Sequence, residues 1–119
     1  MGYMRHNAIV VSAEYGDHLK RAHAEAKRLW MTVSPIVKSP TNGVCTFLVA
    51  PDGSKEGWSE SDTGDAARAA FKVWLDQQRY EDGSGPLKWV EIQYGDDERE
   101  TLVTAHSDED ARIEAGVLT

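Results

Sequence analysis

Residues 33–49, Val-Ser-Pro-Ile-Val-Lys-Ser-Pro-Thr-Asn-Gly-Val-Cys-Thr-Phe-Leu-Val, carry the clearest architectural signal in the chain. Residues 44–49 are apolar and partly β-branched, which is typical of a strand. Residues 33–39 include Pro35, and because proline cannot donate a ladder hydrogen bond, this segment is expected to be an edge strand. The Pro-Thr-Asn-Gly sequence between them has the residues of a tight turn. The pattern therefore predicts an antiparallel hairpin.

Both faces of the strand over residues 44–49 are largely apolar. One face holds Val44, Thr46 and Leu48, and the other holds Cys45, Phe47 and Val49. Strands that are covered on both faces have this composition. We therefore expect this strand near the centre of the sheet, with cover on two sides.

Two amphipathic helices flank the hairpin. Apolar residues recur at helical spacing from Leu19 to Leu29, so the first helix is expected to open near Gly16 and Asp17 and to end near Trp30. The second helix is expected to be capped by Asp62 or Thr63 and to end near Arg79. Its apolar stripe consists of Ala67, Ala70, Phe71, Trp74 and Leu75.

Three further strands are expected, over residues 6–12, 87–94 and 101–106. The order strand, helix, hairpin, helix, hairpin predicts an α+β fold, with a mostly antiparallel sheet of about five strands and two helices packed on one face. We expect residues 1–106 to form a single α+β domain and residues 107–119 to form a polar C-terminal tail.

Composition narrows the function. The chain has 119 residues, with 13 Lys and Arg against 20 Asp and Glu, for a net charge of −7. This acidic balance repels phosphate backbones and disfavours direct nucleic-acid binding. Many of the acidic residues are grouped in the last quarter of the chain. They either form a surface that suits a basic partner or are simply exposed to solvent. These late acidic residues are Asp96, Asp97, Glu98, Glu100, Asp108, Glu109 and Asp110.

No catalytic, metal or cofactor site is predicted. The lone cysteine, Cys45, fits a reducing cytoplasm, and no stretch has the length of a membrane span. The triplet from His23 to Glu25 resembles the deaminase His-x-Glu motif but lacks the paired cysteines. His6 opens the first strand and His106 closes the last, so they would form the acid and base of a phosphoesterase only if they were adjacent. Neither lies in a His-x-Ser/Thr motif.

The tryptophans are the remaining candidates for recognition. We expect Trp30 and Trp74 to lie in the core, and we favour the core for Trp58, which sits in the Ser- and Glu-rich loop over residues 50–62. Trp89 shares a strand face with Glu91 and Gln93, opposite the face of Val90 and Ile92 that we expect to be buried. Its ring is therefore expected at a helix interface or in solvent.

Four segments, residues 5–12, 33–43, 50–62 and 89–98, together resemble a functionally uncharacterised family of small proteins encoded by bacteriophages and prophages. The resemblance brings no catalytic residues. It implies an accessory protein of the host cytoplasm that acts by binding, with inhibition of a host defence or nucleic-acid-handling protein as the leading expectation. Its partner would then be a host protein with a basic surface.

Two alternatives stay open beside this expectation. One is capture of a nucleotide-like signalling molecule, with Trp58 and Trp89 as stacking planes and Arg79 or Arg5 as phosphate ligands. The other is the histidine phosphoesterase described above. The sequence also leaves open an assembly of identical copies. The predicted binding residues are Trp58, Ser59, Glu60, Ser61, Arg79, Trp89, Glu91, Asp96, Asp97 and Glu98.

Overall fold

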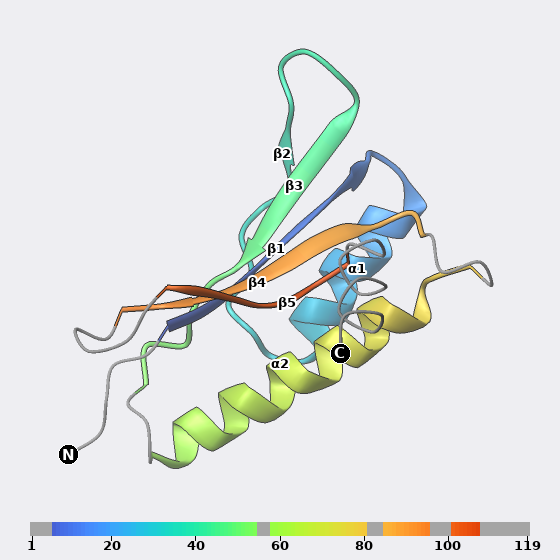
Figure 1. The fold of residues 1–119 in the computed structure, drawn as a ribbon. Helices are drawn as coiled ribbons and strands as arrows, with labels where there is room; N and C mark the ends of the chain where they lie inside the picture. Colours follow the sequence, from blue (N-terminus) through green and yellow to red (C-terminus); the bar gives the residue numbers. More distant parts are fainter. Residues whose placement is uncertain (1–5, 55–57, 81–84, 96–100, 108–119) are drawn as a thin grey trace, which may run out of the picture.

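The computed structural model describes residues 6–54, 58–80, 85–95 and 101–107. Within these residues the chain forms five strands and two helices (Figure 1). In chain order the elements are β1 (His6–Glu14), α1 (Asp17–Arg28), β2 (Val37–Lys38), β3 (Val44–Val49), α2 (Ser59–Gln77), β4 (Lys88–Tyr94) and β5 (Leu102–His106).

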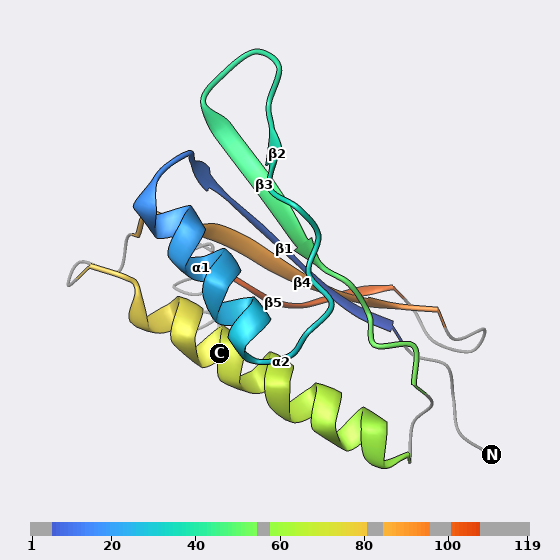
Figure 2. The same ribbon diagram turned by 180° about the vertical axis from the view of Figure 1, so that it is seen from behind.

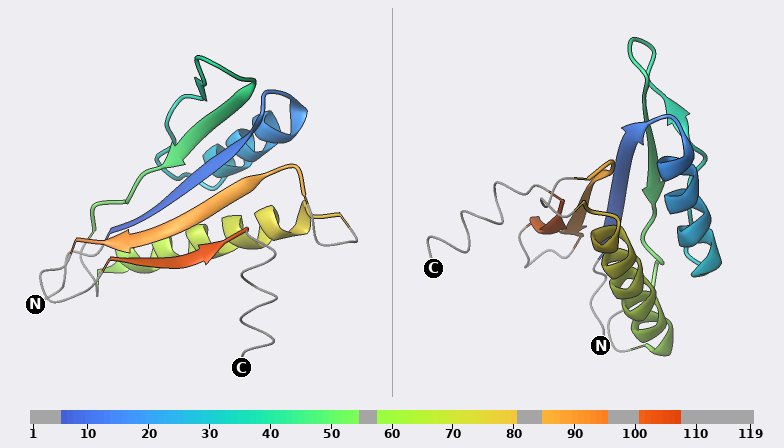
Figure 3. Two further views of the ribbon diagram at one scale, coloured as in Figure 1. Left: turned by 45° about the horizontal axis from the view of Figure 1, so that its top comes forward. Right: turned by 90° about the vertical axis from the view of Figure 1, so that its right-hand side faces the viewer.

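The strands form one antiparallel sheet in the order β2-β3-β1-β4-β5. The first strand is thus the central one, with β3 and β4 on its two sides. This connectivity is the split β-α-β arrangement found in ferredoxin-like folds, extended by β5 at the β4 edge. Figure 3 shows the five strands in this order.

Both helices lie on the same side of the sheet (Figure 2). Helix α1 contributes Leu19, Ala22 and Ala26 to the core, and α2 contributes Phe71 and Leu75. The sheet contributes alternate residues of its strands, as the pleat requires. These sheet residues are Ile9, Val11, Ala13, Cys45, Phe47, Val49 and Trp89. The predicted α+β fold, with two helices on one face, is confirmed.

Strand β3 is covered on one face rather than two. Cys45, Phe47 and Val49 are buried beneath the helices, but Val44 and Leu48 point the other way and are more than a third exposed. Among the described residues no element packs on that second face. Strand β3 does lie near the centre of the sheet, paired with β1 and β2, but the predicted cover on both of its faces is wrong, and β1 takes the central position.

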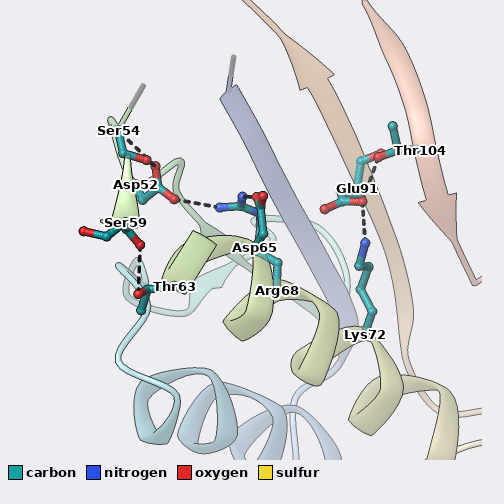
Figure 4. A network of polar contacts seen from close by, with 9 residues as sticks. All are labelled: Asp52, Ser54, Ser59, Thr63, Asp65, Arg68, Lys72, Glu91 and Thr104. Carbon is teal, nitrogen blue, oxygen red and sulfur yellow. Dashed lines mark hydrogen bonds and ion pairs between the residues drawn. The ribbon is translucent and has the colours of Figure 1, made fainter. Parts of the chain in front are cut away.

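On β4 the predicted burial of Val90 and Ile92 is wrong, whereas Trp89 lies at the helix interface, one of the two places expected for it. Trp89 and Glu91 point toward the helices and are 8% and 2% exposed, whereas Val90 and Ile92 are half-buried on the opposite face. Glu91 can be buried because Lys72 of α2 donates to its Oε1 at 2.8 Å and Thr104 of β5 donates to the same oxygen at 2.7 Å (Figure 4). Alternation separates two faces, but it does not say which one is covered.

The ends of several elements differ from the prediction; the strand expected over residues 33–39, for example, is Val37–Lys38 alone. Helix α2 begins at Ser59, several residues before the predicted cap, with Trp58 at the N-cap position. Ser107 is the first residue of the predicted polar tail, but it is buried. Its backbone N–H donates to the carbonyl of Trp89 at 2.9 Å, and its hydroxyl oxygen accepts from the backbone N–H of Trp89 at 2.9 Å. The remainder of that tail, residues 108–119, lies outside the described residues.

Candidate functional site at the start of α2

A cleft of about 420 Å³ lies between the turn after α1, the end of β3 and the first turns of α2. We call it the α2 cleft. Its lining is apolar at Leu29, Met31, Val49, Ala50 and Ala67 and polar at Thr32, Asp52, Ser59, Glu60, Thr63 and Arg68, with Trp30 and Gly64 completing it. An apolar cavity with a few polar groups is the usual form of a binding site.

Trp30 is exposed at the rim of this cleft because of how α1 ends. The amide of Trp30 donates to the carbonyl of Lys27 at 3.0 Å, and the amide of Met31 donates to that of Ala26 at 3.4 Å. This pair of bonds is the Schellman motif, whose reversing residue is usually glycine. Here the reversing residue is Trp30, with φ of 63° and 94% of its surface exposed.

A tryptophan in this conformation is unfavourable on two counts. The left-handed region costs an L-residue about 1–2 kcal/mol, and the exposed ring gains almost nothing from burial. The prediction that Trp30 lies in the core is wrong because the chain reverses its direction at Trp30 itself, and the ring lies in solvent. Trp74 does pack against the core, although it is only partly buried. Unfavourable backbone of this kind is concentrated at functional sites.

Asp52 and Arg68 form the polar wall of the cleft (Figure 4). Asp52 accepts hydrogen bonds from the backbone amide and hydroxyl of Ser54, at 2.9 and 2.6 Å. Nη1 of Arg68 donates to the other oxygen of Asp52 at 3.1 Å, and Nη2 of Arg68 pairs with Asp65. The guanidinium is therefore buried but neutralised by two carboxylates.

Gly64 makes this arrangement sterically feasible. A Cβ at this position in α2 would overlap Oδ2 of Asp52 and crowd Nη1 of Arg68. Glycine inside a helix costs about 1 kcal/mol relative to alanine. Gly64 lies at the turn of α2 where the carboxylate of Asp52 approaches the helix backbone, so an alanine there would displace that carboxylate.

The electrostatic character of the cleft is acidic. Burial alone would raise the pKa of Asp52, but its hydrogen bonds from Ser54 and Arg68 outweigh this and hold the pKa below its ordinary value. Asp52 is therefore charged at neutral pH. Glu60 adds a second carboxylate to the lining, and the single cation, Arg68, is already shared between Asp52 and Asp65.

The predicted binding residues divide into three groups. Ser59 and Glu60 line the α2 cleft, Trp58 precedes them with half of its surface exposed, and Ser61 is buried. Trp89 and Glu91 are buried, although Trp89 also borders two hollows beside β5. Asp96, Asp97 and Glu98 lie outside the described residues, as does Arg5.

The structure does not bring Arg79 to Trp58. They lie at opposite ends of α2, about 30 Å apart at 1.5 Å per residue. Arg79 pairs with Asp76 at 2.6 Å and donates to the carbonyl of Ser107 at 3.2 Å. Arg79 therefore cannot bind the same small ligand as Trp58, and the other predicted phosphate ligand, Arg5, lies outside the described residues.

The two histidines of the phosphoesterase alternative are also apart. His6 lies opposite Tyr94 and His106 opposite Val90, on the two sides of β4. Four residues along a strand span about 13 Å, and two strand spacings add about 10 Å across the sheet. They cannot act as an acid and base on one bond.

Sequence reasoning missed four members of the site: Trp30, Asp52, Gly64 and Arg68. Two of them left a signal, since a glycine and an arginine interrupt the otherwise apolar and alanine-rich pattern around Ala67 and Phe71. Asp52, in the Asp-Gly-Ser turn, lies 16 residues from Arg68. Only the fold shows that the two meet.

No group of three or more histidine, cysteine or acidic side chains is placed to hold a metal ion within the described ranges. Of the two described helices, neither combines the length and apolarity that crossing a membrane requires. Comparison of the chain with protein families, curated proteins and solved structures finds no match. The α2 cleft is therefore the feature of the protein from which a function can be proposed.

Proposed function

We propose that this protein acts by binding, and that the α2 cleft receives a positively charged segment of a partner protein. The observation that carries the proposal is the exposed indole of Trp30, kept at an unfavourable φ beside an acidic, partly apolar cleft. A residue that costs stability and buries nothing is best explained by a contact outside the chain.

The chemistry of the cleft fits a lysine or arginine side chain. The methylene stem would lie along the apolar lining at Leu29, Met31 and Ala67, as long basic side chains do on apolar surfaces. The charged end would meet the carboxylate of Glu60 and the indole face of Trp30, an ion pair combined with a cation–π contact. A phosphate would instead meet uncompensated negative charge.

The resemblance to bacteriophage proteins gives this binding a context, which remains a proposal. A phage-encoded accessory protein that occupies a basic surface of a host defence or nucleic-acid-handling protein would interfere with its work. Acidic groups grouped around an aromatic anchor favour fast, salt-dependent association with such a surface. Capture of a nucleotide-like signal has weaker support, because Arg79 and Trp89 are far from Trp58 or buried.

Calorimetric titration tests the proposal with pairs of short peptides. One peptide carries a single arginine between apolar residues, and its match has glutamine in that place. We expect heat only from the arginine peptide, and weaker affinity as salt rises from about 50 to 500 mM. A nucleotide panel serves as the competing probe, and heat from nucleotides without heat from arginine peptides would overturn the proposal.

Matched variants localise the binding to the cleft. Trp30→Ala and Glu60→Gln should each weaken peptide binding about tenfold or more, as loss of a central contact does. Tyr80→Ala removes another exposed aromatic, and Asp17→Asn removes the corresponding first-turn acid of α1. Equal effects from the two pairs would show that the cleft is not the site.

A further inference from the structure

The face of the sheet opposite the helices is apolar across four neighbouring strands. We call it the open face. Its residues lie side by side in register, with Leu48 opposite Val10 and Val10 opposite Val90, and in the next row Ala8 opposite Ile92 and Ile92 opposite Val103. In an antiparallel sheet with one solvated face, these positions are normally polar.

Several side chains of the open face are exposed in the single chain. Leu48 is 37% exposed, and Val37 and Val103 are more than half exposed. Ser12 and Thr46 are the polar pair in the middle of the open face, and their hydroxyl groups form a hydrogen bond with each other at 2.7 Å. This bond reduces the cost of covering them with an apolar partner. Contiguous exposed apolar surface of this kind marks an interaction site.

Charge is arranged so that two copies can meet at this face. In the described residues the acidic side chains lie mainly on the helices and in the loop after β3, away from it. The open face has Glu14 and Lys88 at one end, a pair of opposite sign. Within the described ranges, this is therefore a surface on which a second copy meets few acidic side chains.

The area is sufficient for a reversible dimer. Five strands at about 4.8 Å and a usable length of about 20 Å give roughly 500 Å² per copy, or roughly 1,000 Å² in total. That is the lower bound for specific interfaces, where association is weak and reversible. Nucleic acid fits this face less well, since in the described strands Tyr94, at one end of β4, is the one Phe, Tyr or Trp that it presents for stacking.

We infer that the open face binds a second copy of this chain, sheet against sheet, about a twofold axis. Two sheets pack in this way about 10 Å apart, with their side chains interleaved. The helices, and with them the α2 cleft, lie on the outer sides of such a dimer (Figure 2). The dimer therefore presents two clefts at once, and a partner with two basic segments would be held more tightly than one segment alone.

Sedimentation equilibrium of the full chain over a range of concentrations tests the inference. We expect a monomer–dimer equilibrium with a dissociation constant in about the micromolar range. Leu48→Glu places a charge in the middle of the open face and should weaken dimerisation at least about tenfold. Val73→Glu, at an α2 position that is 58% exposed, should leave the equilibrium unchanged.

A wild-type chain that stays monomeric at the highest concentration would overturn the inference, as would a Leu48→Glu chain that dimerises normally. If Leu48→Glu does not fold, Val37→Glu at a more exposed position of the same face replaces it. The peptide titration does not depend on this outcome, so the cleft and the dimer fail separately.

Discussion

Replacing Gly64 by alanine should change the free energy of unfolding with a sign that depends on Asp52. In an ordinary helix interior this change stabilises by about 1 kcal/mol. Here the new Cβ would displace the carboxylate of Asp52 from Arg68. Losing hydrogen bonds to a charged group lowers the free energy of unfolding by about 1.5–3 kcal/mol. Because 32% of the Asp52 side chain is exposed and solvent screens its charge, we expect a loss of about 1–2 kcal/mol here.

The two effects nearly cancel in the native chain, so Gly64→Ala should leave it unchanged or less stable by about 1 kcal/mol. With Asp52→Ala already in place the overlap is gone, and the same change should stabilise by about 1 kcal/mol. The coupling between the two sites is then about 1–2 kcal/mol in a double-mutant cycle.

Urea unfolding followed by far-ultraviolet circular dichroism measures all four chains. Ala69→Gly, at an exposed position of α2, calibrates the helix effect on the same scaffold. If Gly64→Ala stabilises the native chain as much as the Asp52→Ala chain, the close approach of Asp52 to the α2 backbone has no energetic weight and our account of the cleft wall fails.

Three further outcomes are expected. Lys72→Ala should cost about 2–3 kcal/mol of unfolding free energy, because it leaves the carboxylate of Glu91 buried without its cation, whereas exposed Lys27→Ala should stay within about 0.5 kcal/mol in the same urea titration. Trp30→Gly should raise the thermal midpoint, since it relieves about 1–2 kcal/mol of backbone cost, while it weakens arginine-peptide binding; a lower midpoint would contradict the strain. Because folding lowers the pKa of Asp52, its charge stabilises the native state above the unfolded pKa of about 4 and that stabilisation is lost as pH falls through the folded pKa. The stability gap between the native chain and Asp52→Asn, measured in urea at several pH values, should therefore shrink in acid, and a constant gap would speak against the assignment.

The fold was largely predictable from local patterns. Three local patterns each specify one element, because each depends only on residues close together in the sequence. They are the Pro-Thr-Asn-Gly turn, the helical spacing from Leu19 to Leu29 and the alternation over residues 88–94. Antiparallel pairing of the β2–β3 and β4–β5 hairpins follows from their short connections. Local patterns do not contain the side of each strand that the helices cover, which explains why Val90 and Ile92 were expected on the buried face of β4.

The site was only partly predictable, for a related reason. The loop ending in Trp58, Ser59 and Glu60 was identified by its composition, and two of these residues do line the cleft. Trp30 was missed because average burial of tryptophan favours the core, whereas one left-handed residue after α1 reverses its direction. Asp52 and Arg68 find each other only through tertiary contact.

The central place of β1 has a consequence for how the chain matures. Ile9 is paired with Val49 and with Glu91, partners that are 40 and 82 positions further along the chain. During synthesis, β1 therefore leaves the ribosome before β3 and β4 have been made. Until then, the backbone N–H and C=O groups on both edges of β1 have no strand to pair with. Assembly is dominated by distant pairings, so folding is completed after synthesis, at a pace set by loop closure.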